Sequence, residues 1–397
     1  MLFSLLSLLQ ADPIQGYVDL HIHLAAHLAV PIYGKGPDSP PPEHFSNFHA
    51  LRPQIFAAQL SEPGPAILVS LAYANPFSAD FETRKSMAAR IERQLAYVEA
   101  FCLRHAARFG LARSPDEARA IVASGRTAIV HGIEGSTKLI DGETDARHWA
   151  DRGVAVITAV HLADNAVGGA WCQEGLLLFL NVPGCWREMA PRHHGLKDPD
   201  RIRALIDAGI VVDLAHMSHQ SFADTIPILR ERGVAPLYTH VTAAAVRRDT
   251  IAMTDEELRE IEALHGLVGV TASLSHLPPR PPPAVLPPDY CKGSITDFRL
   301  EWDHIVAVTG GAPVAWGSDF QGGVDHPRPQ YGPHGCKDKP ENRVLEEIDV
   351  AGLAHPGLVE PMFARLAAEG MDRAPLEASA ERFLEIWALA REKGTAD

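Results

Sequence analysis

The sequence lacks three features, and each absence narrows the class of protein. Its 36 lysine and arginine residues are not clustered in any segment and the formal net charge is −14, which argues against nucleic acid or an anionic membrane as a partner. No apolar run is long enough to span a bilayer. The five cysteines contain no Cys-x-x-Cys pair, and their odd number leaves at least one thiol free or paired between chains.

The scattered cysteines favour free thiols in a reducing compartment, and therefore a cytoplasmic location. A bridge between Cys172 and Cys185 within one loop is an open alternative. A periplasmic or membrane-associated location is accordingly open as well.

The N-terminal segment, residues 1–16, begins with the apolar run 1–9. No lysine or arginine precedes this run, and it is too short to cross a membrane. We expect a helix that packs on the rest of the chain rather than a signal peptide.

Eight apolar runs alternate with amphipathic, helix-like segments along the chain. The runs are residues 17–20, 66–73, 127–131, 154–160, 210–214, 236–239, 267–271 and 313–316. Nearly continuous apolar character is typical of strands covered on both faces, and strands that alternate with helices form parallel sheets. The sequence therefore predicts an α/β fold, a (β/α)8 TIM barrel that forms a single domain over residues 1–397. Residues 84–109 are expected to form its first long helix.

Ligand-type side chains stand where these predicted strands end. His21 and His23 are two residues apart on one strand, so their imidazoles point to the same face. Glu134, His216, His240 and Asp319 each follow or end another apolar run. Active sites of TIM barrels lie at the carboxyl ends of the strands, so we expect these side chains to converge there. The longest loops, 24–65 and 320–345, leave from the same end and are the expected walls of a pocket.

Imidazoles and carboxylates in these numbers suit two divalent ions, with zinc the expected metal. We expect His21 and His23 to hold one ion, His216 and His240 to hold the other, and Glu134 to bridge them through its two oxygens. A water shared by two such ions ionises near neutral pH and becomes a nucleophile.

Asp319 is the expected proton acceptor that passes the proton to the leaving group. His161, which follows the run 154–160, is expected to bind substrate and to donate a hydrogen bond to the oxyanion. Structural roles remain open for both, because Asp319 could cap a loop and strand-end histidines often do so. Asp19 and Asp213 either orient ligand histidines or make buried polar contacts.

The same motifs, in the same order, resemble the membrane dipeptidase (renal dipeptidase, peptidase M19) family of the amidohydrolase superfamily. The matching stretches are Gly132-Ile-Glu-Gly, Val212-Asp-Leu-Ala-His-Met-Ser, Thr239-His-Val-Thr-Ala-Ala-Ala-Val, Thr254-Asp-Glu-Glu-Leu, Gly317-Ser-Asp-Phe-Gln-Gly and Ala380-Glu-Arg-Phe-Leu-Glu-Ile-Trp. The resemblance implies a zinc-dependent barrel hydrolase that cleaves dipeptides, some members also opening β-lactams. By the same resemblance Glu134 is the bridging ligand, and His216 and His240 belong to the second metal. His161 would contact substrate and Asp319 would be catalytic.

The chain departs from the family pattern in two places. The family opens with His-x-Asp, whereas this chain has His21-Ile-His23, which makes the first site less negative by one charge but still suited to zinc. The family's arginine that binds the substrate carboxylate corresponds to Ile251 here. A buried carboxylate without a charged partner is costly, so another cation is needed if the substrate is a free dipeptide. Candidates are Arg247, Arg248, Arg280 and Arg328.

The sequence thus predicts a binuclear zinc hydrolase that cleaves the amide bond of a dipeptide or a similar small amide. One alternative is a lactonase or phosphotriesterase-like hydrolase, whose metals are usually bridged by a carboxylated lysine after the fourth strand; here His161 follows that strand and no lysine is near. Another is a metal-binding barrel without turnover. A homodimer is an open alternative, since no segment identifies an interface.

Overall fold

The computed structural model describes residues 13–42, 52–60, 64–73, 82–172, 179, 181–189, 194–246, 252–272, 290–342 and 344–394. The apolar run 1–9, expected to form a helix, lies outside these residues. Within them, no helix is both long enough and apolar enough to cross a membrane.

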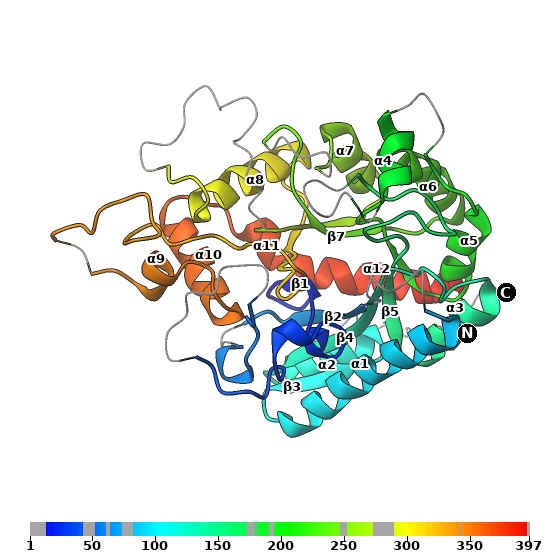
Figure 1. The fold of residues 1–397 in the computed structure, drawn as a ribbon, viewed down its shortest axis with the longest axis horizontal. Coiled ribbons are helices and arrows are strands. Elements are labelled where there is room, and N and C mark those ends of the chain that lie inside the picture. The colour runs from blue at the N-terminus through cyan, green and yellow to red at the C-terminus, as the bar shows by residue number, and fades with distance from the viewer. Residues whose placement is uncertain are drawn as a thin grey trace, which may run out of the picture.

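Eight parallel strands close into a barrel (Figure 1), which confirms the predicted TIM-barrel fold. The strands of the ring are β1 (Val18–Ile22), β2 (Ile67–Tyr73), β4 (Thr127–Glu134), β5 (Val154–Thr158), β6 (Val211–Asp213), β7 (Leu237–Val241), β8 (Leu267–Val270) and β9 (Val314–Trp316). Pairing of β2 with β4 and of β1 with β9 completes the ring. All eight expected runs form strands, because each is apolar enough to be buried on both faces.

A ninth strand, β3 (Phe109–Ala112), was not predicted. It pairs with the first half of β4, while β5 pairs with the second half of the same edge of β4. The helix expected over residues 84–109 is therefore too long: α1 (Arg84–Arg104) ends before β3 begins. A four-residue strand that follows a helix so closely is too short to show an alternating pattern, so it could not be predicted from the sequence.

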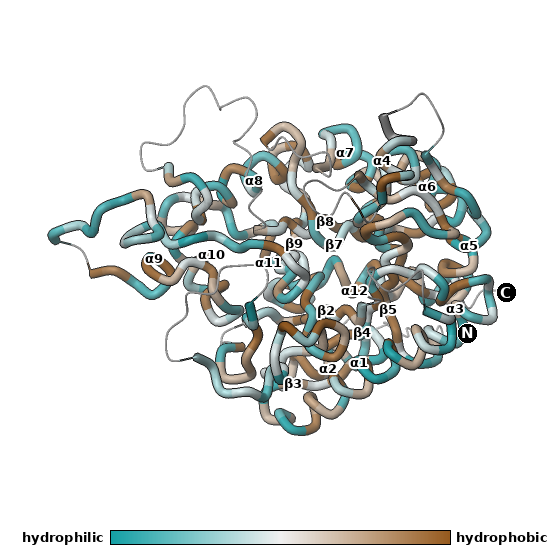
Figure 2. The backbone as a smooth tube through the Cα atoms, in the orientation of Figure 1, coloured by the Kyte–Doolittle hydropathy of each residue, from teal (hydrophilic) through white to brown (hydrophobic). Residues whose placement is uncertain are grey.

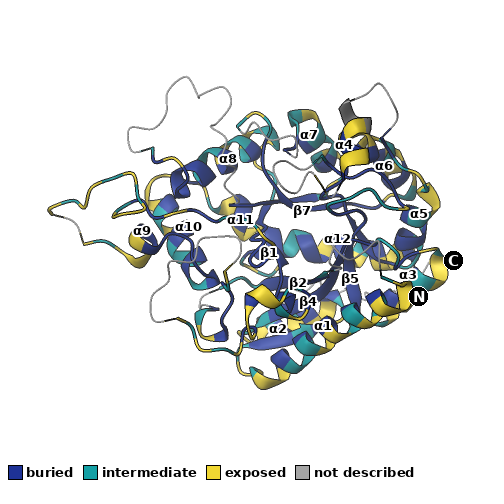
Figure 3. Ribbon diagram, viewed as in Figure 1, coloured by how far each residue is buried: buried dark blue, intermediate teal, exposed yellow. Residues whose placement is uncertain are grey.

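Helices surround the barrel, with their exposed residues on the outer side (Figure 3). They are α1, α2 (Pro115–Ala123), α3 (Glu143–Asp151), α4 (Val182–Met189), α5 (Pro199–Asp207), α6 (His219–Arg232), α7 (Asp255–Ala263), α8 (Ile295–Val308), α9 (Glu347–Ala351), α10 (Val359–Ala368), α11 (Ala374–Glu377) and α12 (Ser379–Gly394). The start of α7 has the expected capping box, in which Thr254 and Glu257 each bond the other's backbone N–H.

The barrel interior is filled by apolar side chains and closed at one end by α12. Hydrophobic residues are concentrated along the central strands (Figure 2). Phe383, Leu384 and Trp387 of α12 are fully or almost fully buried and pack in one cluster with barrel residues such as Leu20 and Leu237. The Ser379 hydroxyl accepts a hydrogen bond from the Val18 N–H, which places the start of α12 at the amino end of the barrel.

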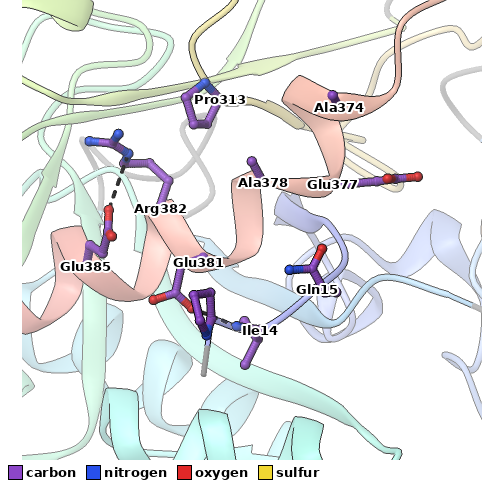
Figure 4. Close-up of a pocket in the computed structure, with 10 residues that line it drawn as sticks. Ile14, Gln15, Pro313, Ala374, Glu377, Ala378, Glu381, Arg382 and Glu385 are labelled. Atoms are coloured by element: carbon purple, nitrogen blue, oxygen red, sulfur yellow. Dashed lines mark hydrogen bonds and ion pairs between the residues drawn. The ribbon is translucent and has the colours of Figure 1, made fainter. Parts of the chain in front are cut away.

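The outer side of this closed end carries a shallow groove of about 350 Å³ (Figure 4). Its charged side chains pair with one another or with their neighbours: Arg382 with Glu385, Glu381 with Arg119. In surface ion pairs of this kind each charged group is balanced by its partner, and no histidine is among the residues that line the groove. The histidines and carboxylates singled out from the sequence lie at the opposite end of the barrel.

Two disulfides join Cys172 to Cys185 and Cys291 to Cys336, with Cα atoms 4.6 and 5.8 Å apart, while Cys102 is free and buried. The expectation of free thiols is therefore wrong for four of the five cysteines, and the alternative Cys172–Cys185 bridge is confirmed. The second bridge, between cysteines 45 residues apart, depends on tertiary contacts that the spacing does not reveal.

Replacing Trp387 with alanine should lower the free energy of unfolding by about 3–5 kcal/mol, because a large buried side chain at the barrel end is removed. Urea unfolding followed by circular dichroism measures this loss. Glu385→Ala on the exposed side of the same helix is the control, expected to change stability by less than about 1 kcal/mol. Equal effects of the two substitutions would contradict the packing described for α12.

Thiol titration of the unreduced, denatured chain should find one thiol, that of Cys102, and five after reduction. Cys102→Ser should lower the first number to zero. Five thiols before reduction would show that neither disulfide forms.

Candidate metal centre

All seven residues singled out from the sequence meet at the carboxyl end of the barrel. They are His21 and His23 on or directly after β1, Glu134 at the end of β4, His161 after β5, His216 after β6, His240 on β7 and Asp319 after β9. Every one of them is buried. Their donor atoms form three overlapping groups, each within 4.8 Å: His21, Glu134 and His240; His21, His23 and Asp319; Glu134, His161 and His216.

The first cluster combines the β1 histidines with two carboxylates. The Nε2 atoms of His21 and His23 lie 3.1 Å apart. Asp319 Oδ1 is 3.3 Å from His23 Nε2, and Glu134 Oε1 is 3.3 Å from His21 Nε2. Four donor atoms from three strands therefore face one small volume.

The second cluster is built around the same glutamate. The Nε2 atoms of His216 and His240 lie 3.0 Å apart, and Glu134 Oε1 is 3.1 Å from His216 Nε2. His161 Nε2 lies 3.4 Å from the same oxygen. Glu134 thus contacts both histidine pairs, which is the position that a bridging ligand requires.

The arrangement of donor atoms fits divalent cations. Two imidazole nitrogens about 3 Å apart repel unless a proton or a cation lies between them, because both present lone pairs. Here two such pairs face the same buried carboxylate. Nitrogen and oxygen ligands of this kind are those that zinc and similar ions prefer.

Electrostatics favours ionised carboxylates in this buried cluster. Burial alone would raise the pKa of Glu134, but His161 and His21 outweigh burial and hold that pKa well below its usual range. Burial likewise opposes ionisation of Asp319, yet the hydrogen bond from His23 and the neighbouring imidazoles lower its pKa to about 2. Two buried negative charges side by side require positive partners, which metal ions provide.

His161 differs from the other imidazoles in its electrostatic setting. Burial lowers its pKa to about 3, although Glu134 opposes the shift. The ring is therefore neutral at physiological pH. Its Nδ1 has no hydrogen-bond partner among the described residues.

The backbone around Asp319 is held in an unusual conformation. Asp319, Gln321 and His216 have φ angles of 52°, 64° and 65°, a region that side chains other than glycine rarely adopt. The Asp319 N–H donates to the His21 carbonyl at 2.7 Å, so the strain is maintained by bonding to the neighbouring strand. Gly322 is required here, since any Cβ at that position would collide with the Asp319 carboxylate. Strained positions of this kind cluster at functional sites.

Aromatic residues that the sequence analysis did not single out lie beside the same cluster of side chains. Tyr73, at the end of β2, lies with its ring 5.7 Å from the rings of both His23 and His161. The Trp171 ring lies 5.7 Å from that of His216, and the backbone N–H of Trp171 donates to the His216 carbonyl. The position of Tyr73 at a strand end, opposite Glu134 in the β2–β4 pairing, was the signal that could have identified it.

The remaining candidates fall outside the cluster. Asp19 binds backbone rather than an imidazole, accepting from the N–H groups of His21 and Ser318. Arg328 lies against Gly293, before α8. The other three proposed cations are outside the described residues, namely Arg247, Arg248 and Arg280. The same holds for Ile251, which stands at the position of the family's arginine.

Comparison with known proteins supports the family suggested by the motifs. The family model of membrane dipeptidases, peptidase family M19, matches residues 68–338. The chain belongs to this family. Members of this family are metal-dependent hydrolases, in agreement with the clustered donor atoms of this chain.

Two curated relatives are about a quarter identical to this chain over the residues that match. Dipeptidase tcpJ of Claviceps purpurea is 24% identical over 222 residues, covering 55% of this chain and 46% of the relative. The uncharacterized dipeptidase C965.12 of Schizosaccharomyces pombe is 25% identical over 216 residues, covering 54% and 45%. The matched part therefore spans about half the length of these relatives.

Solved structures resemble the whole fold. The probable dipeptidase PvdM from Pseudomonas aeruginosa superposes with a TM-score of 0.69 at 16% identity, covering 96% of each chain. A metallo peptidase from Rhodobacter sphaeroides superposes with a TM-score of 0.63 at 18% identity, covering 96% of this chain and all of the other. At such identities the likeness establishes the barrel fold.

The zinc-loaded wild type is predicted to retain two ions per chain after dialysis and Glu134→Gln one or none, because the amide removes the negative charge that contacts both histidine pairs. Elemental analysis of the dialysed protein gives the ratio. Glu143→Gln, on the exposed first turn of α3, should leave zinc content unchanged. Full zinc content in the Glu134 variant would contradict a bridging role.

Proposed function

We propose that the chain is a binuclear zinc hydrolase that cleaves the amide bond of a dipeptide or a similar small amide. The observation that carries this proposal is the position of Glu134, whose carboxylate lies within 3.5 Å of His21 and His23 of one pair and within 3.1 Å of His216 of the other. The family match supports it, and the Rhodobacter sphaeroides relative was solved with a phosphinate mimic of the dipeptide L-Ala-D-Ala.

In this proposal His21 and His23 hold one ion, His216 and His240 hold the second, and Glu134 lies between them. Bound there, the two ions would polarise the substrate carbonyl and lower the pKa of a water molecule. The surrounding barrel holds the ligands at the ends of four different strands, so the distance between the two sites is fixed by strand packing.

Asp319 is assigned the proton transfer. Its carboxylate is ionised and buried, and it lies beside the first histidine pair. It can therefore take a proton from the attacking water and deliver it to the leaving amine. The strained backbone and the close approach of Gly322 limit the directions in which the carboxylate can point.

His161 is assigned the role of donating a hydrogen bond to the substrate oxyanion. A neutral imidazole carries one N–H, and the low pKa of His161 keeps the ring in this form. A hydrogen bond to the developing negative charge is worth more in a buried site than in water. The Tyr73 ring beside His161 and the Trp171 ring beside His216 offer apolar contacts to a small substrate in this proposal.

The disulfides also change the expected location. Structural disulfides persist in oxidising compartments and are rare in the cytoplasm. We therefore infer that this protein works in an oxidising compartment, in place of the cytoplasmic location expected from scattered cysteines.

Zinc-reconstituted protein should hydrolyse free dipeptides, and removal of zinc by a chelator should abolish turnover reversibly. Asp319→Asn should lower kcat about 10²- to 10⁴-fold, the usual contribution of a general acid–base group. Asp151→Asn, on the exposed end of α3, is the matched control and should keep full activity. A panel of L–L and L–D dipeptides beside their C-terminal amides provides the measurement.

The comparison of acids with amides defines the substrate class. Preference for free dipeptides would mean that a cation binds the terminal carboxylate although the family's arginine is replaced by Ile251. Equal cleavage of amides would mean that the carboxylate is not recognised. Two bound zinc ions without turnover of either substrate would contradict the proposal and direct the search to lactones and phosphoesters.

A further inference from the structure

Thr239 lies directly behind both halves of the candidate metal centre. It precedes His240 on β7 and is fully buried. Its Oγ1 is 2.8 Å from Asp213 Oδ2, 2.9 Å from His21 Nδ1 and 3.1 Å from His240 Nδ1. One hydroxyl therefore contacts a histidine from each of the two pairs.

The hydrogen of this hydroxyl is directed to Asp213. The other partners of the Asp213 carboxylate are all donors: the Thr158 hydroxyl at 2.6 Å and the backbone N–H groups of Thr239 and Ala215. The carboxylate thus acts as an acceptor towards its whole surroundings, and the Thr239 hydroxyl donates to it. A hydroxyl has one hydrogen and two lone pairs, so Thr239 is left with two acceptor positions.

Both remaining positions face an imidazole Nδ1. Nδ1–H of His21 and Nδ1–H of His240 can each donate to one lone pair, which satisfies the hydroxyl completely. A neutral imidazole with its hydrogen on Nδ1 has a free lone pair on Nε2. In His21 and His240 the Nε2 atoms are those that face Glu134, His23 and His216.

The other two histidines are held differently. His23 Nδ1 lies 3.2 Å from the Leu71 carbonyl, a backbone partner that no side-chain substitution removes. His216 Nδ1 has no hydrogen-bond partner among the residues that the structure describes. Thr239 is therefore the side chain on which one ligand of each pair depends.

We propose that Thr239, anchored by Asp213, is a positioning residue shared by both metal sites, which fixes the tautomer and orientation of His21 and His240 together. This inference rests on the binuclear centre proposed above. Partners that bind the far nitrogen of a ligand histidine typically change metal affinity 10- to 100-fold when removed. Because one hydroxyl serves both imidazoles, its loss should weaken both sites.

The test compares zinc affinity, measured by competition with a fluorescent chelator, in wild type, Thr239→Val, Thr239→Ser and Thr158→Val. Valine keeps the shape of threonine but cannot accept from either imidazole, so zinc binding should weaken 10- to 100-fold at both sites. Serine keeps the hydroxyl and should bind both ions within about threefold of wild type. Thr158→Val is the matched control, since it removes a hydroxyl from the same Asp213 oxygen but from no histidine.

Thermal unfolding of the four metal-free proteins shows whether each variant folds. If Thr239→Val does not fold, the zinc affinity of Thr239→Ser still tests the role of the hydroxyl. Wild-type affinity in Thr239→Val, loss at one site alone, equal loss in Thr158→Val, or failure of serine to restore binding would each overturn the shared role. A wild type that binds fewer than two zinc ions would instead overturn the binuclear centre and this inference with it.

Discussion

The site depends on the burial of two ionised carboxylates among imidazoles. Removing a carboxylate from water costs several kcal/mol, and the cost is recovered only when positive charge and hydrogen bonds surround it. Glu134 and Asp319 meet this requirement by lying against four histidines from three strands and the loops that follow them. Neutral imidazoles alone offer partial compensation, whereas divalent ions between them would neutralise both carboxylates. This need for cations explains why the donor atoms are gathered so closely.

The barrel supplies the rigidity that such a cluster needs. Each ligand stands at the end of a strand whose neighbours fix its position through parallel pairing, and α12 seals the opposite end with large apolar side chains. Behind the ligands, Asp213 and Thr239 extend the polar network one layer deeper into the barrel. The disulfides fasten the loops outside: Cys172 follows Trp171, whose ring packs near His216, and is joined to α4. The centre is thus supported by packing inside the barrel and by a disulfide in a neighbouring loop.

Much of this arrangement could be predicted from the sequence, because ligand-type residues stand at the ends of the apolar runs that form the strands. Apolar runs identified the eight barrel strands, and histidines or carboxylates at their ends identified the site, since all parallel strands end at the same face. The pairing of Cys291 with Cys336 and the short β3 could not be found, because they depend on contacts distant in sequence or on too few residues. Tyr73 and Trp171 were missed for a related reason: an aromatic residue near a strand end usually belongs to the core, and only the fold shows that these two rings lie beside the imidazoles.

The most direct test of the binuclear centre is a crystal structure of the zinc-loaded protein with anomalous diffraction recorded on both sides of the zinc absorption edge. The account predicts two anomalous peaks per chain. One should lie among His21, His23 and Glu134, and the other among His216, His240 and Glu134, with the glutamate between them. A single peak, or peaks remote from Glu134, would contradict it.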